Sequence, residues 1–358
     1  MSQLPTTNGK PETVNHGDEP ASERTTWAAS FRTWVTSMRA WIFLGFLLVG
    51  FEVWARIAYN TTFLFNPFNL SSIAVFTVGP LLLALGQTFV VISGGIDLSV
   101  GFTMGLAAVV FSQILNLSTG VLWDPLAMVV AAVVALLASA IPGLINGLLI
   151  AKLRIPPFIG TLGMYGVARG VAYLLARGTT VPISNPVVTY IGNESLLSIP
   201  ITVLITIALT CGMMFMLSQS RFGQHVYAIG GSRQASLRAG INVSRNTIAL
   251  YILSSLAAGI GGILYTARFT AGAAQAGEPL LLDSIAAVVI GGASLFGGSG
   301  TITGTVIGAL IIAVIQYGLV FVNVEPFWQF VAVGIVIIIS VLVDQTTQKQ
   351  LSGGRSDE

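Results

Sequence analysis

The stretch P-L-A-M-V-V-A-A-V-V-A-L-L-A-S-A-I-P-G-L-I-N-G-L-L-I-A, residues 125–151, contains no charged side chain. It is longer than the roughly 20 apolar residues that cross a bilayer as a helix. The composition of the whole chain agrees: 54% of the 358 residues are hydrophobic, 8% are charged, and the mean hydropathy is +0.84. A soluble domain carries about 25% charged residues, so this chain has too little charge to cover a soluble surface. We therefore expect an all-α, polytopic membrane helix bundle.

Ten apolar segments are predicted to be transmembrane helices, one of them broken or half-length. The exception is 284–296, which is short and ends in glycines. Residues 1–38 are expected to be a disordered cytoplasmic tail, 39–345 the transmembrane domain, and 346–358 a cytoplasmic C-terminal tail. The predicted spans are 40–59, 72–92, 100–117, 125–151, 157–175, 199–219, 246–268, 284–296, 301–322 and 327–343.

The basic residues predict the orientation of the bundle. If the N-terminus is cytoplasmic, an even number of spans returns the C-terminus to the same side. Twelve of the 16 Lys and Arg residues then lie inside, and the short loops alone favour the same arrangement. We expect both termini in the cytoplasm.

Small residues indicate how the helices pack. Lipid gives helices no hydrophobic reason to associate, so close backbone approach at small residues must supply the contact. Pro80 and Pro142 fall inside spans and are expected to kink them. G-x-x-x-G pairs occur at Gly101/Gly105, Gly143/Gly147, Gly166/Gly170 and Gly304/Gly308.

Two further features of the spans have structural interpretations. Glu52 and Arg56 are spaced i,i+4 in the first span and are expected to form a structural ion pair. Cys211, the single cysteine, excludes an intrachain disulfide and is expected to be a small buried side chain.

The turn between the second and third spans is the first candidate site. Its sequence G-G-I-D-L-S-V-G, residues 94–101, allows a tight turn at the glycines and puts Asp97 where a helix N-cap belongs. The carboxylate would satisfy free N–H groups at membrane depth, or it would contact a transported molecule; the structural role is favoured. A related string, G-G-A-S-L at 291–295, suggests an internal repeat of the kind that builds translocation sites.

The basic loop 220–245 is the second candidate site. Gly230–Gly231 is expected to turn the chain, Ser232 to cap a short helix over residues 233–239, and Gly240 to end it. Such a helix, with exposed arginines, suits the docking of a cytoplasmic partner. An ordinary basic inner loop is the alternative.

Enzymatic motifs are absent from the sequence. There is no G-x-x-x-x-G-K-[ST] nucleotide loop, no H-E-x-x-H metal motif and no G-x-S-x-G nucleophile motif. No metal site or catalytic residue is predicted. Arg169 is the one ionisable residue well inside a predicted span, with no carboxylate to face it. Because proton-coupled carriers bury several such groups, the energy source is expected on another chain.

Four strings carry a resemblance to a family. Together they closely resemble the hallmarks of the ribose/xylose/arabinose-type permeases of bacterial ABC importers, in the right order and across about residues 70–344. They are V-I-S-G-G-I-D-L-S-V-G (91–101), G-L-I-N-G-L-L-I-A-K-L-R-I-P-P-F-I-G-T-L-G (143–163), R-F-G-Q-H-V-Y-A-I-G-G (221–231) and A-A-V-V-I-G-G-A-S-L-F-G-G-S-G (286–300).

The resemblance implies partners and a location. It implies a homodimer in the bacterial inner membrane, a cytoplasmic ABC ATPase that binds ATP and magnesium, and a periplasmic sugar-binding protein. No cofactor is expected on this chain. The cargo is expected to be a monosaccharide or sugar alcohol, because a neutral polyol suits a pathway poor in charge. A nucleoside or branched-chain amino-acid permease, and a self-sufficient secondary carrier or channel, are the alternatives.

Two sets of residues are assigned on these grounds. Polar residues in or beside spans are candidates for the substrate pathway: Gln87, Asp97, Asn146, Thr161, Tyr165 and Ser294. By the resemblance, residues 221–240 are the coupling helix, and ATPase coupling is assigned to Arg221, Gly223, Tyr227, Gly230, Gly231, Arg233, Arg238 and Gly240.

Overall fold

The structure is a computed structural model that describes residues 23–325 and 327–353. The chain divides into two compact units at the boundary between Arg39 and Ala40. The packing described below is that of the second unit, from Ala40 onward.

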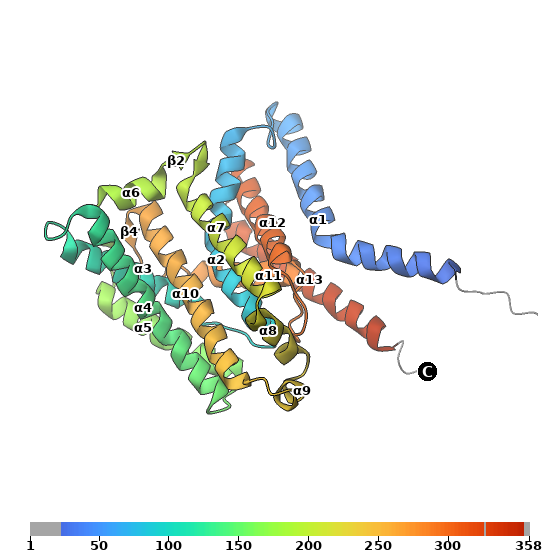
Figure 1. Cartoon of the computed structure of the whole chain (residues 1–358). Coiled ribbons are helices and arrows are strands. Elements are labelled where there is room, and N and C mark those ends of the chain that lie inside the picture. Colours follow the sequence, from blue (N-terminus) through green and yellow to red (C-terminus); the bar gives the residue numbers. More distant parts are fainter. Residues whose placement is uncertain (1–22, 326, 354–358) are drawn as a thin grey trace, which may run out of the picture. The chain divides into compact units, whose positions relative to one another are not determined.

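The described residues form thirteen helices and four two-residue strands (Figure 1). Strand β1 pairs antiparallel with β4 and so joins the loops after α5 and after α10, whereas β2 and β3 pair within the single loop between α6 and α7. The helices are α1 (Glu23–Tyr59), α2 (Pro67–Ile92), α3 (Val100–Ser118), α4 (Asp124–Ala151), α5 (Pro157–Ala176), α6 (Pro186–Asn193), α7 (Ile201–Gln219), α8 (Arg221–Gly231), α9 (Arg233–Arg238), α10 (Val243–Phe269), α11 (Glu278–Ile290), α12 (Ile302–Phe321) and α13 (Phe327–Gly353). The strands are β1 (Val181–Pro182), β2 (Ser195–Leu196), β3 (Ile199–Pro200) and β4 (Ala271–Gly272).

Eight helices of the described part are long and apolar enough to cross a membrane, and they match the first seven predicted spans and the ninth. The tenth corresponds to the shorter apolar stretch Phe327–Ile339. The polytopic α-helical bundle is confirmed.

The predicted half-length helix is confirmed, but its position is not. Helix α11 has 13 residues, about 20 Å at 1.5 Å per residue, against a hydrocarbon core of about 30 Å. It begins six residues before the predicted 284–296 and ends at Ile290. It ends there because Gly291 and Gly292 start a turn in which Gly292 has φ +90°.

Part of the expected disordered tail is described as helix, and its disorder stays a prediction. Residues 23–38 are helical and continuous with the first span, since extending a helix is far less costly than nucleating one. Residues 1–22 lie outside the described residues. At the other end, α13 continues through the predicted tail as far as Gly353.

Helix α2 lies at the centre of the bundle. Of its membrane-spanning window 83% is buried, against 22% for residues 40–59 of α1 and 28% for α5. It contacts α7, α10, α11 and α12. A helix that is apolar all round is expected in such a position. The short helix α6 lies at one end of the bundle and α8 and α9 at the other, here called the α6 end and the α9 end (Figure 1).

Three of the four G-x-x-x-G pairs pack as predicted. A Cβ at Gly105 would overlap the carbonyl oxygen of Ala274, and the pairs at Gly143/Gly147 and Gly304/Gly308 lie equally close to neighbouring backbone. The fourth pair, Gly166/Gly170 on α5, has nothing within 4 Å. That face therefore has no partner within the described part of the chain. Cys211 on α7 is exposed as well, so its predicted burial is wrong.

Candidate functional site

The turn at residues 93–99, which joins α2 to α3, is built around the carboxylate of Asp97. Asp97 is fully buried and accepts three hydrogen bonds: from the Ser99 N–H (3.0 Å), the Ser99 hydroxyl (2.6 Å) and the hydroxyl of Ser254 on α10 (2.9 Å). The predicted N-cap is wrong by two residues, because Ser99 is the N-cap of α3. Asp97 instead forms an Asx turn onto Ser99 and so satisfies a backbone N–H group.

Three more predicted pathway residues hold this turn from neighbouring helices. Gln87 of α2 donates from Nε2 to the carbonyl oxygen of Asp97, and Asn146 of α4 donates from Nδ2 to the Ser99 hydroxyl at 2.9 Å. The hydroxyl of Thr161 on α5 lies 3.3 Å from the carbonyl oxygen of Ile96 in the turn and donates at 2.9 Å to that of Pro157 in its own helix. All are fully buried. In this conformation they form an interior polar network, so their lining of a pathway stays a prediction.

The other two predicted pathway residues lie elsewhere. Tyr165 of α5 packs edge-on against Phe102, with ring centroids 4.7 Å apart, and its hydroxyl donates to Glu278 Oε1 at 3.4 Å. Ser294 lies in the turn after α11, where its hydroxyl accepts from the N–H of Phe296 at 3.2 Å. The structure therefore does not bring the six residues together at one place.

The turns after α2 and after α11 have the same backbone geometry. Gly94 and Gly292 have φ +81° and +90°. In both turns the N–H of this glycine donates to the carbonyl oxygen three residues earlier, at 2.9 Å. The N–H of the following residue donates to the carbonyl oxygen five residues before it, at 2.9 Å in the first turn and 3.1 Å in the second. This is the Schellman motif. Because many helices end in this way, the internal repeat that the paired glycine strings suggest stays a prediction.

The two turns meet at α8. The N–H of Gly298 donates to the carbonyl oxygen of Ile92, the last residue of α2, at 2.8 Å. Gly230 of α8 packs against the same carbonyl group, and a Cβ at Gly230 would overlap its oxygen. Tyr227 of α8 donates its hydroxyl to the carbonyl oxygen of Gly300 at 2.6 Å. We call these five residues the glycine junction. Burial raises the pKa of Tyr227, so its hydroxyl keeps the proton that it donates.

The boundaries of α9 follow the prediction, and those of α8 do not. Gly230 and Gly231 are helical rather than a turn, because the chain first becomes extended at Ser232, with φ −162°. The Ser232 hydroxyl accepts from the N–H of Ala235 at 3.2 Å, which confirms the cap. Gly240 has φ +78° and ends α9 in a Schellman motif, which confirms the stop.

The surface of α8 and α9 is basic. Arg221, Arg233 and Arg238 are exposed, and Leu237 is 57% exposed beside them. Gly223 allows the close turn from α7 into α8, since a Cβ there would overlap the backbone of α7. A groove of about 330 Å³ lies between α9 and the turn from α4 to α5, lined by Ile150, Arg154, Ile155, Pro156, Pro157, Arg233 and Leu237.

The open face of α5 is unlike a lipid-facing surface. Gly163, Gly166 and Gly170 have nothing within 4 Å of a Cβ position. Arg169 is exposed between them, with its guanidinium 5.3 Å from the ring centroid of Phe102. A charged side chain facing hydrocarbon is costly, so this face is suited to protein or water.

A cavity of about 580 Å³ lies between the first half of α2, the second half of α10 and the start of α11. That volume is in the range of small-molecule sites. Its walls include aromatic rings and several polar groups: Phe76, Thr202, Tyr265, Arg268, Phe269, Gln275 and Glu278. The sequence does not predict this cavity. Arg268 lies at the end of α10 and Glu278 at the start of α11, and only the fold brings them together.

The chain is similar to known proteins over most of its length. A family described as "Branched-chain amino acid transport system / permease component" matches residues 69–341. The chain belongs to this permease family.

Relatives of the permease carry sugar names. The ribose import permease of Bacillus subtilis is 38% identical over 74% of this chain and 80% of its own length. The galactose/methyl galactoside import permease of Haemophilus influenzae is 35% identical over 80% of this chain and 89% of its own. The fructose import permease of Rhizobium meliloti is 34% identical over 74% of each. No solved structure matches.

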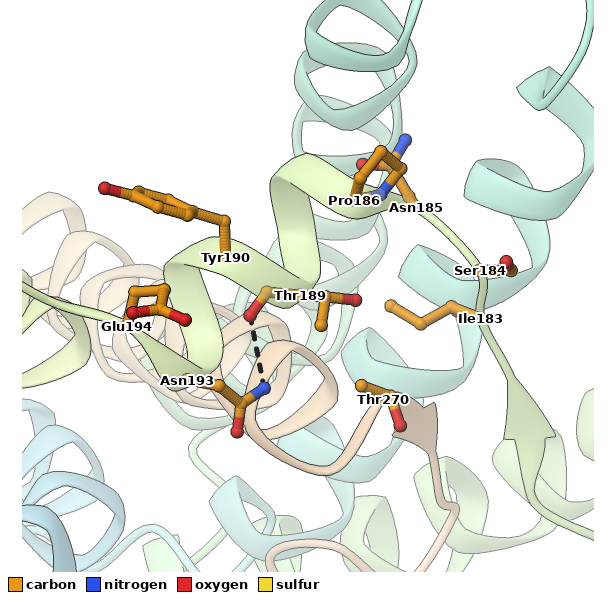
Figure 2. A pocket seen from close by; sticks show the side chains of 9 residues that line it. All are labelled: Ile183, Ser184, Asn185, Pro186, Thr189, Tyr190, Asn193, Glu194 and Thr270. Carbon is orange, nitrogen blue, oxygen red and sulfur yellow. Dashed lines mark hydrogen bonds between the residues drawn. The ribbon is translucent and has the colours of Figure 1, made fainter.

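At the α6 end, the permease has a shallow pocket of about 520 Å³ (Figure 2). Asn185 caps α6 by accepting from the N–H groups of Val187 and Val188, both at 3.1 Å, and so has a structural role. Tyr190 points away from the pocket floor and is 57% exposed. The lining residues are Ile183, Ser184, Asn185, Pro186, Thr189, Tyr190, Asn193, Glu194 and Thr270.

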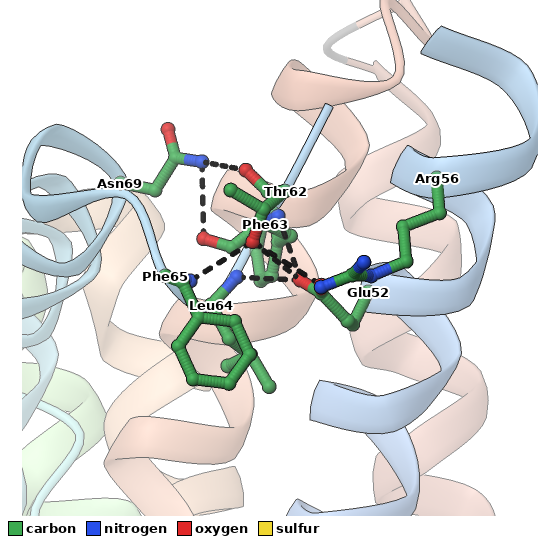
Figure 3. Close-up of polar contacts among 7 residues, drawn as sticks. All are labelled: Glu52, Arg56, Thr62, Phe63, Leu64, Phe65 and Asn69. Carbon is green, nitrogen blue, oxygen red and sulfur yellow. Dashed lines mark hydrogen bonds and ion pairs between the residues drawn. The ribbon is translucent and has the colours of Figure 1, made fainter. Parts of the chain in front are cut away.

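The predicted ion pair of the permease is confirmed, and it has a second role. Arg56 Nε lies 2.6 Å from Glu52 Oε1, with the arginine side chain 62% exposed and the glutamate 11%. Glu52 also accepts from the N–H groups of Phe63 (2.8 Å) and Leu64 (2.9 Å), as Figure 3 shows. The carboxylate therefore fixes the turn between α1 and α2. It is not free to act in transport.

Proposed function

We propose that the chain is the membrane-spanning subunit of an ATP-driven importer that moves a monosaccharide or sugar alcohol into the cytoplasm. The glycine junction is the observation that carries this proposal. It places a helix of the basic α8–α9 segment in backbone contact with both repeated turns. A rigid body that binds α9 could thereby move both turns together, because no flexible side chain lies between them.

The substrate class rests on the relatives. The family description names branched-chain amino acids, whereas relatives that cover most of this chain are named for ribose, galactose and fructose. In support of a neutral polyol, the cavity wall holds the packed rings of Tyr265 and Phe269, with centroids 4.6 Å apart, and the polar side chains of Arg268 and Gln275. We propose this cavity as part of the substrate pathway.

An ATPase is proposed at the α9 end, on the cytoplasmic side. The exposed Arg233 and Arg238 and the neighbouring apolar groove would receive an acidic and apolar surface of that partner. ATP and magnesium would be bound there and not on this chain. A sugar-binding protein is proposed at the opposite, periplasmic end, where the exposed Tyr190 and Glu194 lie.

A second copy of the chain is proposed on the open face of α5. Gly166 and Gly170 are the one G-x-x-x-G pair that the described residues leave without a contact. Close approach of two such faces would supply the missing packing and would shield Arg169 from lipid.

Charge reversal at α9 tests the docking surface. Replacing Arg233→Glu together with Arg238→Glu is expected to abolish ATP-dependent sugar uptake, while the protein still inserts in the membrane. Arg177→Glu, an exposed arginine at the C-cap of α5 near the α6 end, is the matched control and should leave docking intact. Normal uptake by the double variant would remove the role proposed for α9.

A further inference from the structure

Asp97 is a buried carboxylate without a cationic partner among the described residues. Its three hydrogen-bond partners are all donors, namely one N–H and two hydroxyl groups. No Lys, Arg or His side chain of the described residues lies within 4 Å of it. A charged carboxylate can accept from all three donors. A buried charge is costly unless an opposite charge compensates it.

The directions of the hydrogen bonds leave the side-chain oxygen of Asn146 without a partner among the described residues. Ser99 has one hydroxyl proton and donates it to Asp97 Oδ1. Ser99 can therefore only accept from Asn146, which must turn Nδ2 toward it and Oδ1 away. Asn146 Oδ1 is fully buried and forms no hydrogen bond within the described part of the chain. A water or an ion from outside the protein would satisfy this oxygen.

Two more buried oxygens without partners lie beside it. Thr103 Oγ1 and Ser255 Oγ are both fully buried and form no hydrogen bond with described residues. Thr103 is one helical turn beyond Ser99, and Ser255 follows the serine that donates to Asp97. Ser255 Oγ would lie 2.6 Å from a Cβ at Gly143, which is one turn before Asn146 on α4. The three oxygens belong to α3, α4 and α10, and these helices pack against one another.

We propose that this place binds a monovalent cation, with Asn146 Oδ1, Thr103 Oγ1 and Ser255 Oγ as ligands and Asp97 as the counter-charge. Oxygen ligands suit a hard cation. A single carboxylate balances one positive charge, whereas calcium and magnesium sites use more carboxylates or retained waters. We take sodium as the ion and potassium as its larger competitor. The cation would stabilise the turn that joins the two central helices.

Thermal unfolding of the purified full chain tests the site without any transport measurement. The melting temperature is measured in sodium chloride and in N-methylglucamine chloride at equal ionic strength. It is expected to rise with sodium along a saturable curve, and less with potassium, because a ligand that binds only the folded state stabilises it. Equal melting temperatures in the two salts would mean a proton or an internal water instead, and would overturn the proposal.

Variants locate the effect. Asp97→Asn keeps the hydrogen bonds from Ser99 and should lose the sodium response. Ser255→Ala should weaken sodium binding and so raise the half-saturating sodium concentration by about tenfold. Asp283→Asn is the matched control: its carboxylate is also buried, accepts from Gln316 Nε2 at 2.8 Å, and should keep the response.

Two outcomes would contradict the assignment. An undiminished sodium response in Asp97→Asn would place the ion elsewhere. If Asp97→Asn does not fold, an unchanged half-saturating concentration in Ser255→Ala decides against the site. Because none of these measurements uses uptake, the cation site and the proposed transport function can fail independently.

Discussion

Two carboxylates, Glu52 and Asp97, each accept hydrogen bonds from a turn of the backbone. Glu52 holds the N–H groups of Phe63 and Leu64, and Asp97 holds that of Ser99. Backbone groups in or near a bilayer find little water, so side chains must satisfy them. Both carboxylates therefore serve the chain's own turns, which is why neither is free as a proton carrier.

The turn before α2 gives a prediction at this scale. Glu52→Ala should lower the melting temperature more than Arg56→Ala does. The glutamate accepts from two backbone N–H groups as well as from Arg56, whereas the arginine loses one partly exposed contact. Thermal unfolding of both variants checks this. Equal losses would show that the ion pair, and not the turn, matters.

The residues of the Asp97 network show what the sequence could and could not predict. The turn, its glycines and the structural use of the carboxylate follow from G-G-I-D-L-S. Its partner Ser254 could not be predicted, because it lies 157 residues away and nothing near it marks it out. The pairing of distant polar groups depends on how the helices pack.

At the scale of elements, the glycine junction joins α8 to both turns through backbone contacts at Gly230 and Gly298 and through the Tyr227 hydroxyl. The last turn of α8 lies against the end of α2 at Gly230, and the turn after α11 bonds to the same carbonyl through Gly298. Glycine is required at Gly230 because any Cβ would overlap the carbonyl oxygen of Ile92. Its neighbour Gly231 has nothing within 4 Å.

This contrast gives a prediction for coupling. Gly230→Ala should reduce ATP-dependent uptake by about tenfold, because overpacking costs about 1–3 kcal/mol and would separate α8 from the two turns. Gly231→Ala should leave uptake near the wild-type level. Uptake and ATP hydrolysis are measured on the same vesicles, so that loss of coupling is separated from loss of docking. Similar uptake by both variants would rule out the junction as the link.

The half-length helix shows the limit of prediction at the element scale. Its existence follows from a short apolar run that ends in glycines. The apolar pattern predicts a start six residues too late, because Glu278 and Pro279 interrupt it although they form the first turn of α11. Proline is favoured at that position, and an acidic residue there complements the helix dipole.

At the scale of the whole molecule, α5 leaves one helix face without a partner. Gly166 and Gly170 have no neighbour within 4 Å, and Arg169 is exposed beside them. This open face of small residues with an arginine beside it is the reason why we propose a second copy there.

Cysteine cross-linking tests this interface. In a Cys211→Ser background, Gly166→Cys should form a disulfide-linked dimer in oxidised membranes, because two α5 faces would meet there. Leu137→Cys on α4, where the native side chain is 65% exposed, is the control and should stay monomeric. Cross-linking is read from the band shift in non-reducing gels. Equal cross-linking at both positions would indicate random collisions and contradict the interface.

The central claim is that this chain conducts a sugar only when another protein supplies the energy. The most direct measurement is the uptake of labelled monosaccharides by vesicles that carry the chain, with or without the cognate ATPase, binding protein and ATP. Labelled branched-chain amino acids serve as the competing cargo. We predict accumulation of a sugar only with all components present. Robust accumulation by the chain alone, with ATP withheld and an ion gradient imposed, would contradict the account.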